Sequence, residues 1–216
     1  MVELIAKGIS KRLKGKPILN NINLELYGGN IYGFIGRNGS GKTMLIRLLS
    51  GLIYPSEGEV FYNGKQLHKE ISYLPKLGVV IENIGLYPEF TGFKNLQFLA
   101  KINRLIGDQE IEEAINRVGL DPYDRRSFSK YSLGMKQRII LAQAIMEKPD
   151  IILLDEPTNA LDENGIDLIR KIISEEKERG ALIVIASHNK EDIELLCDNV
   201  YRLQEGSIVD TIEVSL

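Results

Sequence analysis

Several features that would place this chain in a specialised class are missing from its 216 residues. It has one cysteine, Cys197, so no internal disulfide can form, and the apolar residues around it indicate a buried structural thiol of a cytosolic protein. No run of about eighteen apolar residues is present. The N-terminus also lacks the basic region and apolar stretch of a secretory signal. We therefore expect a polypeptide that does not itself cross a membrane.

An excess of charge of one sign is missing as well. The chain has 27 Lys and Arg residues against 30 Asp and Glu residues, a formal net charge of −3. Such a balance gives no global basic surface for DNA or RNA, so we expect no nucleic acid among the partners. Internal repeats and low-complexity tracts are not apparent either. The length fits one large α/β domain or a core with an inserted lobe.

The most informative segment is the glycine-rich residues 36–43, which lie between an apolar run and the apolar residues 44–49. They fit the pattern G-x-x-x-x-G-K-[ST] in the strand, loop and helix context that the pattern requires. Glycines let backbone N–H groups turn toward phosphate oxygens, and the helix N-terminus adds partial positive charge where the anion binds. We expect Lys42 to bridge the β- and γ-phosphates of a nucleotide and Thr43 to offer its hydroxyl to Mg²⁺.

Two continuous apolar runs, residues 151–154 and 181–186, are typical of strands that are covered on both faces in a parallel sheet. The first run is followed by Asp155 and Glu156, at the sheet edge where open α/β sheets bind ligands. We expect Asp155 to hold Mg²⁺ through oxygen ligation. Glu156 is placed to accept a proton from an attacking water.

The rest of the chain alternates between strand and helix patterns. Residues 2–9 and 18–26 have the two-residue period of half-buried strands, and residues 60–64 carry a hairpin signal. Helical spacing from about residue 91 to residue 130 predicts an inserted helical lobe. A crossover helix is expected from Asp162 to Arg179, with the aspartate as its N-cap.

A second phosphate-binding site is expected after the helical lobe. Ser132 and the backbone of Gly134 precede the apolar residues 139–144, at a helix N-terminus that can bind an anion in the same way as the first. The separation of the two sites indicates that they serve different nucleotides, as they would in a head-to-tail pair of chains.

Taken together, these motifs resemble the ATP-binding subunit of an ABC transporter over nearly the whole chain. The matching segments are residues 36–43 with the Walker A motif, 132–137 with the ABC signature, 151–156 with Walker B and its catalytic glutamate, 159–162 with the D-loop, and His188 with the switch histidine.

The resemblance implies an α/β fold: a P-loop NTPase core with a mostly parallel sheet flanked by helices, an N-terminal antiparallel β subdomain and an inserted helical subdomain. It implies one domain, with residues 1–86 and 131–216 as the core and residues 87–130 as the helical subdomain. The cofactors would be ATP and Mg²⁺.

It also implies a homodimer, or a heterodimer with a related ATPase subunit, in which each of two ATP molecules lies between one subunit's Walker motifs and the partner's signature. Hydrolysis would reopen this sandwich and drive integral membrane permease subunits made from other chains. The expected location is therefore cytoplasmic, peripheral at the inner face of the cell membrane.

The site residues expected from the motifs and the resemblance fall into three groups. The catalytic residues are Glu156, His188 and Lys42. The nucleotide-binding residues are Gly36, Arg37, Asn38, Gly39, Ser40, Gly41, Lys42, Thr43, Met44, Leu13, Ser132, Gly134 and Asp162. The metal ligands are Thr43, Asp155 and Glu82. His188 follows an apolar strand at the same sheet edge as Glu156, from where it can hydrogen-bond the γ-phosphate.

Two positions depart from the family pattern. An aromatic residue that stacks on adenine is common near Lys11 and Arg12, and here Leu13 stands in that place. We therefore expect weaker or less selective base binding. Glu82 replaces the usual Q-loop glutamine. Its carboxylate can reach Mg²⁺, although it repels the γ-phosphate more than an amide does.

The segment around Glu82 also indicates the direction of transport and the surface that contacts the permease. Residues 81–88 resemble the same loop of bacitracin- and peptide-antibiotic-type exporter ATPases, which favours export. We expect the permease to contact the groove between the core and the helical lobe, around residues 82–90. The alternative is that the apolar residues there, Leu86, Tyr87 and Phe90, pack in the core.

Two other functions compete with a transport ATPase. Asn189 to Asp192 spells the guanine-reading N-K-x-D motif of a GTP-dependent switch. That class, however, needs x-x-Gly after Asp155, and it leaves the segment at Ser132 unexplained. A soluble ABC protein acting on DNA or ribosomes would carry a long coiled-coil insertion or a tandem second domain, and neither pattern is present.

Overall fold

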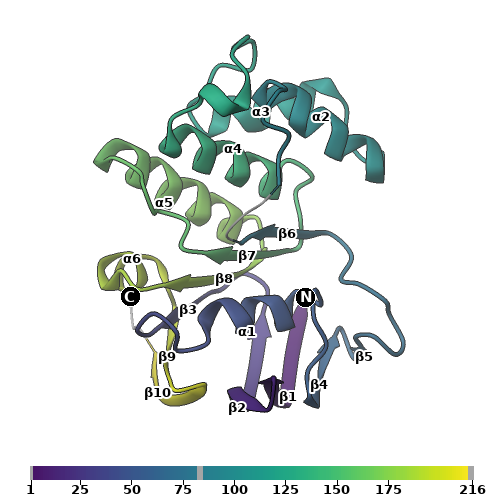
Figure 1. Ribbon diagram of the computed structural model, residues 1–216, viewed down its shortest axis with the longest axis vertical. Helices are drawn as coiled ribbons and strands as arrows, with labels where there is room; N and C mark the ends of the chain where they lie inside the picture. Colours follow the sequence, from purple (N-terminus) through teal and green to yellow (C-terminus); the bar gives the residue numbers. More distant parts are fainter. Residues whose placement is uncertain (1, 82–84, 214–216) are drawn as a thin grey trace.

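Two β-sheets with helices around them make up the computed structural model, which describes residues 2–81 and 85–213 (Figure 1). Within these residues, one sheet has four antiparallel strands in the order β2-β1-β4-β5, and the other has six strands in the order β10-β9-β3-β8-β7-β6. The strands are β1 (Glu3–Leu13), β2 (Lys16–Tyr27), β3 (Ile31–Ile35), β4 (Glu57–Tyr62), β5 (Lys65–Gln66), β6 (Leu77–Val80), β7 (Ile151–Asp155), β8 (Leu182–Ser187), β9 (Asn199–Gln204) and β10 (Ser207–Glu213). The helices are α1 (Lys42–Leu49), α2 (Gly92–Asn103), α3 (Asp108–Arg117), α4 (Leu133–Ile145), α5 (Glu163–Glu178) and α6 (Lys190–Leu196), with a short 3-10 helix at Phe128–Lys130.

The larger sheet is parallel except for β10, which runs antiparallel to β9. Every residue of β7 and β8 is buried, as their continuous apolar runs predict. The register pairs Asp155 with Ala186 and Ile35 with Ser187. The carboxyl ends of β3, β7 and β8 therefore meet at one edge, and the loops that follow them carry the predicted site.

Local sequence explains how the connecting elements start and stop. Asn63 and Gly64, with φ of 47° and 78°, join β4 to β5 in the left-handed conformation that tight hairpins need. The Asp162 side chain accepts a hydrogen bond from the backbone N–H of Gly165 at 3.0 Å and so caps α5, as predicted. That helix ends just before Gly180, whose φ is 95°.

The hydrophobic core lies on both faces of the larger sheet. Successive side chains of a strand point to opposite faces, so Ile152 and Leu154 pack toward α2, α3, α4 and α5. Ile151 and Leu153 instead pack toward α1 and the antiparallel sheet. Figure 1 shows α2 to α5 on one side of the sheet and α1 on the other. Each fully buried aliphatic side chain of this kind contributes about 1.5–3 kcal/mol. The predicted α/β fold class, with its antiparallel β subdomain and helical lobe, is confirmed.

No helix within residues 2–81 and 85–213 combines the length and the apolar character that crossing a membrane requires.

Candidate functional site

The phosphate-binding loop connects β3 to α1, and its glycines are required by its conformation. Gly39 and Gly41 have φ of 82° and 110°, a region that L side chains rarely adopt. Position 36 has no room for a side chain, because an added Cβ would lie 2.3 Å from the carbonyl oxygen of Leu203. The chain therefore wraps tightly around the N-terminus of α1, which begins at Lys42.

The interior of this loop has the polar groups that a phosphate needs. Lys42 is 7% exposed, and its Nζ donates to the carbonyl oxygen of Gly36 at 2.8 Å. The same ammonium lies 3.9 Å from Oε1 of Glu156. Ser40 Oγ is buried and has no hydrogen-bond partner among the described residues. A buried ammonium, an unpaired hydroxyl and a helix N-terminus together fit a phosphate chain.

Two of the three predicted metal ligands lie in contact. Thr43 Oγ1 donates to Asp155 Oδ2 at 2.5 Å, and Asp155 is 4% exposed at the end of β7. Hydroxyl and carboxylate oxygens are ligands that suit Mg²⁺, which completes its shell with water and substrate phosphate. Among the described residues there is no group of three or more His, Cys, Asp or Glu side chains that could hold a metal. The third predicted ligand, Glu82, lies outside the described residues.

Glu156 and His188 are joined by several hydrogen bonds at this edge of the sheet. The Glu156 carboxylate accepts hydrogen bonds from the His188 backbone N–H at 3.1 Å and from Ser187 Oγ at 3.1 Å. The Nδ1 atom of His188 lies 2.9 Å from Oε2 of the same carboxylate. Glu156 has φ of 51°, which costs a non-glycine residue about 1 kcal/mol or more. The structure thus brings two predicted catalytic residues together and holds one of them in a strained backbone conformation.

Ser132 and Gly134 lie at the start of α4, as predicted. Ser132 is the N-cap, and its Oγ accepts from the Met135 backbone N–H at 3.2 Å. A Cβ at Gly134 would approach the carbonyl oxygen of Ala160 to 3.2 Å. From the next turn of the helix, Gln137 Nε2 donates to the carbonyl oxygen of Pro157 at 3.3 Å. The start of α4 therefore packs directly on the segment that follows Glu156.

The remaining predicted nucleotide ligands are spread around the loop. Arg37 and Asn38 are exposed and line a cavity of about 770 Å³ together with His188. Met44 is half-buried and packs against the core on the α1 side. Leu13 is 44% exposed at the end of β1 and is not among the described residues that line this cavity.

Asp162 has two interactions besides its position in the D-loop segment. It caps α5, and its Oδ1 accepts from Arg138 Nη2 at 3.2 Å. Its side chain is 71% exposed, so it remains accessible from outside this chain.

Sequence reasoning missed several residues that support the site. Ser187 and Gln137 contact the Glu156 segment, and Thr158 bonds to Asp192, which in turn pairs with Arg170. Ser187 has a local signal, a polar side chain at the end of an apolar strand, and Gln137 and Asp192 lie within the signature segment and the N-K-x-D pattern. The other contacts join residues at least 19 positions apart in sequence, so no local pattern announces them.

Asn189 and Asp192 of the N-K-x-D segment form hydrogen bonds with other residues of this chain. Asn189 caps α6 by accepting from the Glu191 backbone N–H at 3.0 Å. Asp192 is 1% exposed, and both of its carboxylate oxygens are already hydrogen-bonded. This carboxylate is therefore not presented to a guanine base.

Comparison with known proteins agrees with the geometry. The family model described as ABC transporter matches residues 19–159. The chain is 49% identical to the uncharacterized ABC transporter ATP-binding protein YybJ of Bacillus subtilis, over 96% of this chain and 94% of that protein. It is 39% identical to the bacitracin transport ATP-binding protein BcrA of Enterococcus faecalis, over 97% of this chain and 68% of that protein.

Among solved structures, the chain resembles a dimeric bacterial ABC transporter cassette, MJ0796, with a TM-score of 0.88 over the full length of both chains. At 23% identity this likeness shows the fold alone. The family match and the sequence relatives confirm the predicted class of activity, ATP binding and hydrolysis. The chain is thus an ATP-binding protein of the ABC transporter family.

Proposed function

We propose that this chain hydrolyses ATP with Glu156 as the proton acceptor and that hydrolysis powers a separate permease. The observation that carries this proposal is the position of the Glu156 carboxylate, 3.9 Å from the ammonium of Lys42 in the phosphate loop and 2.9 Å from His188 Nδ1. A carboxylate beside the γ-phosphate can orient the attacking water and take its proton.

The other site residues divide the remaining work. Lys42 and the loop amides offset the negative charge that develops on the transferred phosphoryl group. His188 contacts the carboxylate through Nδ1, and a hydrogen bond to the γ-phosphate, whose oxygens only accept, would be donated by an N–H at Nε2. Thr43 and Asp155 would hold Mg²⁺, whose charge neutralises the β- and γ-phosphate oxygens when it is bound. Glu82 is proposed as a further ligand.

We propose that the working form is a dimer, either of two copies or of this chain with a related ATPase subunit. Ser132 and the Gly134 backbone at the N-terminus of α4 in one subunit would complete the nucleotide site that α1 of the other subunit begins. The exposed Asp162 and the exposed loop residues Arg37 and Asn38 are available for contacts across that interface.

The domain division expected from the sequence is retained in this proposal: residues 1–86 and 131–216 form the core of one domain, and residues 87–130 form the helical subdomain. Direction of transport is proposed to be export, because residues 81–88 resemble the same loop of bacitracin- and peptide-antibiotic-type exporter ATPases, and the bacitracin transport protein BcrA is a 39% identical relative. Such a chain would sit in the cytoplasm, peripheral at the inner face of the membrane, through its permease.

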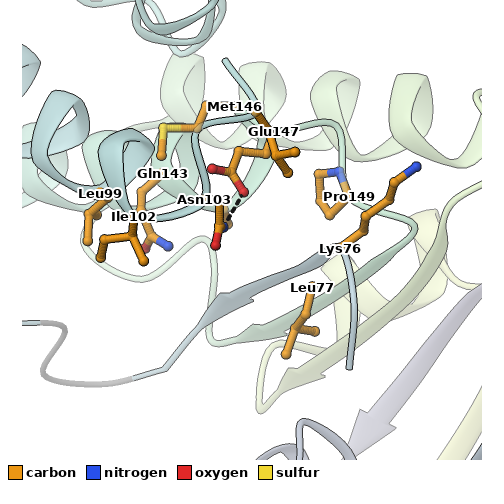
Figure 2. A pocket seen from close by; sticks show the side chains of 11 residues that line it. Lys76, Leu77, Leu99, Ile102, Asn103, Gln143, Met146, Glu147 and Pro149 are labelled. Atoms are coloured by element: carbon orange, nitrogen blue, oxygen red, sulfur yellow. Dashed lines mark hydrogen bonds between the residues drawn. The ribbon is translucent and has the colours of Figure 1, made fainter. Parts of the chain in front are cut away.

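The surface proposed for the permease lies between the helical lobe and the edge strand β6. Tyr87 is 55% exposed and forms an aromatic cluster with Phe90 and Phe98, with ring centroids 5.1–6.2 Å apart. A second hollow, of about 150 Å³, lies between β6 and the ends of α2 and α4 (Figure 2). Ile102 and Leu105, which line it, are 75% and 62% exposed. Exposed apolar residues of this kind suit an incoming apolar helix face.

The test is the substitution Glu156→Gln, which keeps the shape of the side chain but removes the proton acceptor. Steady-state phosphate release should fall by about 10²–10⁴-fold, while ATP still binds. Glu178→Gln, on the exposed end of α5, serves as the matched control and should hydrolyse ATP like the wild type. Undiminished hydrolysis by the Glu156→Gln variant would contradict the assigned role.

A further inference from the structure

We propose that Asp192, together with Thr158 and Arg170, forms a buried clamp that positions Glu156 and His188 relative to each other. The inference rests on the proposed roles of those two residues. It assigns the clamp no contact with nucleotide, so its members are positioning residues.

The clamp is defined by three hydrogen bonds to one carboxylate. Thr158 Oγ1 donates to Asp192 Oδ2 at 2.5 Å. Arg170 donates to Oδ1 of the same carboxylate through Nε at 3.0 Å and Nη2 at 2.7 Å. Thr158 is 7% exposed and Asp192 1% exposed, so water does not compete for these bonds. Charge-assisted bonds of this kind are stronger than neutral ones.

The position of the clamp connects it to the reacting groups. Thr158 lies two residues after Glu156, in the segment that follows β7, and Asp192 lies four residues after His188, in the first turn of α6. Between Glu156 and Thr158 stands Pro157, whose ring fixes φ. Because that segment is short and stiff, a shift of Thr158 is transmitted to the Glu156 backbone, which is already strained at φ 51°.

Arg170 and Asp192 form an ion pair within the clamp, and the other ion pairs of Arg170 are weak. Burial pulls the pKa of Arg170 down, and its hydrogen bond to Asp192, with help from Glu191, pulls it up by more, so the guanidinium stays charged. Arg170 also lies 3.6 Å from Asp167 and 3.4 Å from Glu191. Those two carboxylates are 76% and 70% exposed, so their pairs with Arg170 contribute little.

The experiment compares kcat and KM for ATP in three variants of the full chain. Thr158→Val removes the hydroxyl with little change in volume, Thr158→Ser keeps the hydroxyl, and Asp167→Asn removes an exposed partner of Arg170 without touching Asp192. We expect Thr158→Val to lower kcat by about 10- to 100-fold with KM changed less than about twofold, since misplacement of reacting groups costs this much. Thr158→Ser should recover most of the rate, and Asp167→Asn should match the wild type.

Melting temperatures separate positioning from simple loss of fold, with all rates measured well below the lowest of them. A Thr158→Val variant with wild-type kcat would overturn the clamp, as would a fall in kcat that Thr158→Ser shares equally. If Thr158→Val does not fold, Arg170→Lys replaces it. That variant keeps the charge but cannot make both bonds to Oδ1, so a wild-type kcat there would equally overturn the proposal.

Measuring the Glu156→Gln variant in the same assay distinguishes the clamp from the proposed function on which it rests. If Glu156→Gln loses hydrolysis while Thr158→Val keeps it, the clamp is wrong and the proposed function stands. If Glu156→Gln hydrolyses ATP at the wild-type rate, both are wrong, because the clamp would then be positioning a group that the reaction does not use.

Discussion

At the residue scale, the chain places the Glu156 carboxylate and the Cys197 thiol in opposite surroundings. The Glu156 carboxylate receives hydrogen bonds from Ser187 and His188 and stays within reach of the phosphate loop. Cys197 is 2% exposed behind Gly33, where an added Cβ would lie 2.7 Å from its sulfur. Burial, with smaller contributions from Asp198 and Asp192, raises the pKa of this thiol to about 12.

The thiol should therefore be unreactive in the folded chain. With a pKa of about 12 the thiolate fraction at pH 8 is about 10⁻⁴, and burial blocks the reagent as well. A chromogenic disulfide reagent should label Cys197 slowly at pH 8 and rapidly once guanidinium chloride unfolds the chain. Ser129→Cys, at an exposed position, is the control and should react at once. Rapid labelling of the native wild type would contradict the structure.

At the element scale, helix α4 is attached to the sheet by a very close approach of backbone to backbone. Gly78 in β6 lies under the last turn of α4, where an added Cβ would meet the carbonyl oxygen of Ala144 at 2.1 Å and Pro149 Cγ at 2.9 Å. Neither atom belongs to a flexible side chain. The distance between β6 and α4 is therefore set by the absence of a side chain at this one position.

The substitution Gly78→Ala should separate these two elements and destabilise the protein by about 1–3 kcal/mol, the usual cost of overpacking. A urea titration followed by circular dichroism measures this as a lower midpoint. Gly85→Ala is the matched control, since Gly85 is exposed and nothing lies within 4 Å of its added Cβ. Equal midpoints for the two variants would show that the sheet and the helix move apart without cost.

At the scale of the whole molecule, one chain carries two helix N-termini that we propose as anion sites, at α1 and at α4. The α1 site has its own buried lysine, whereas the α4 site offers Ser132 and backbone next to the exposed Leu133. The proposed dimer uses both at once, because each nucleotide then touches one N-terminus from each copy.

This arrangement predicts that ATP brings two copies together through Ser132. In the Glu156→Gln background, Ser132→Arg should keep the chain monomeric in the presence of ATP, since a long cation at the interface blocks close approach. Light scattering after size-exclusion chromatography measures the mass. Ser129→Arg, three residues away and exposed, should leave the ATP-dependent dimer intact. A dimer that forms equally well with Ser132→Arg would contradict the proposed interface.

The amino-acid sequence by itself determined the elements and placed the groups that we propose as catalytic at the ends of those elements. The spacing of residues 36–43 predicted the phosphate loop, and the apolar runs before Glu156 and His188 predicted two buried parallel strands. Asp162 was identified as the cap of α5. These predictions succeed because backbone conformation, capping and strand burial depend on residues that are neighbours along the chain.

Only the tertiary structure decided which distant residues support those groups. The clamp at Asp192 joins segments 34 and 22 positions apart, and the crowding at Gly36 comes from a carbonyl oxygen at Leu203. The guanine-reading pattern at residues 189–192 was indistinguishable in sequence from a helix cap followed by a buried ion pair. Hydrogen bonding and close packing depend on distance in space, and folding alone brings these side chains within reach of one another.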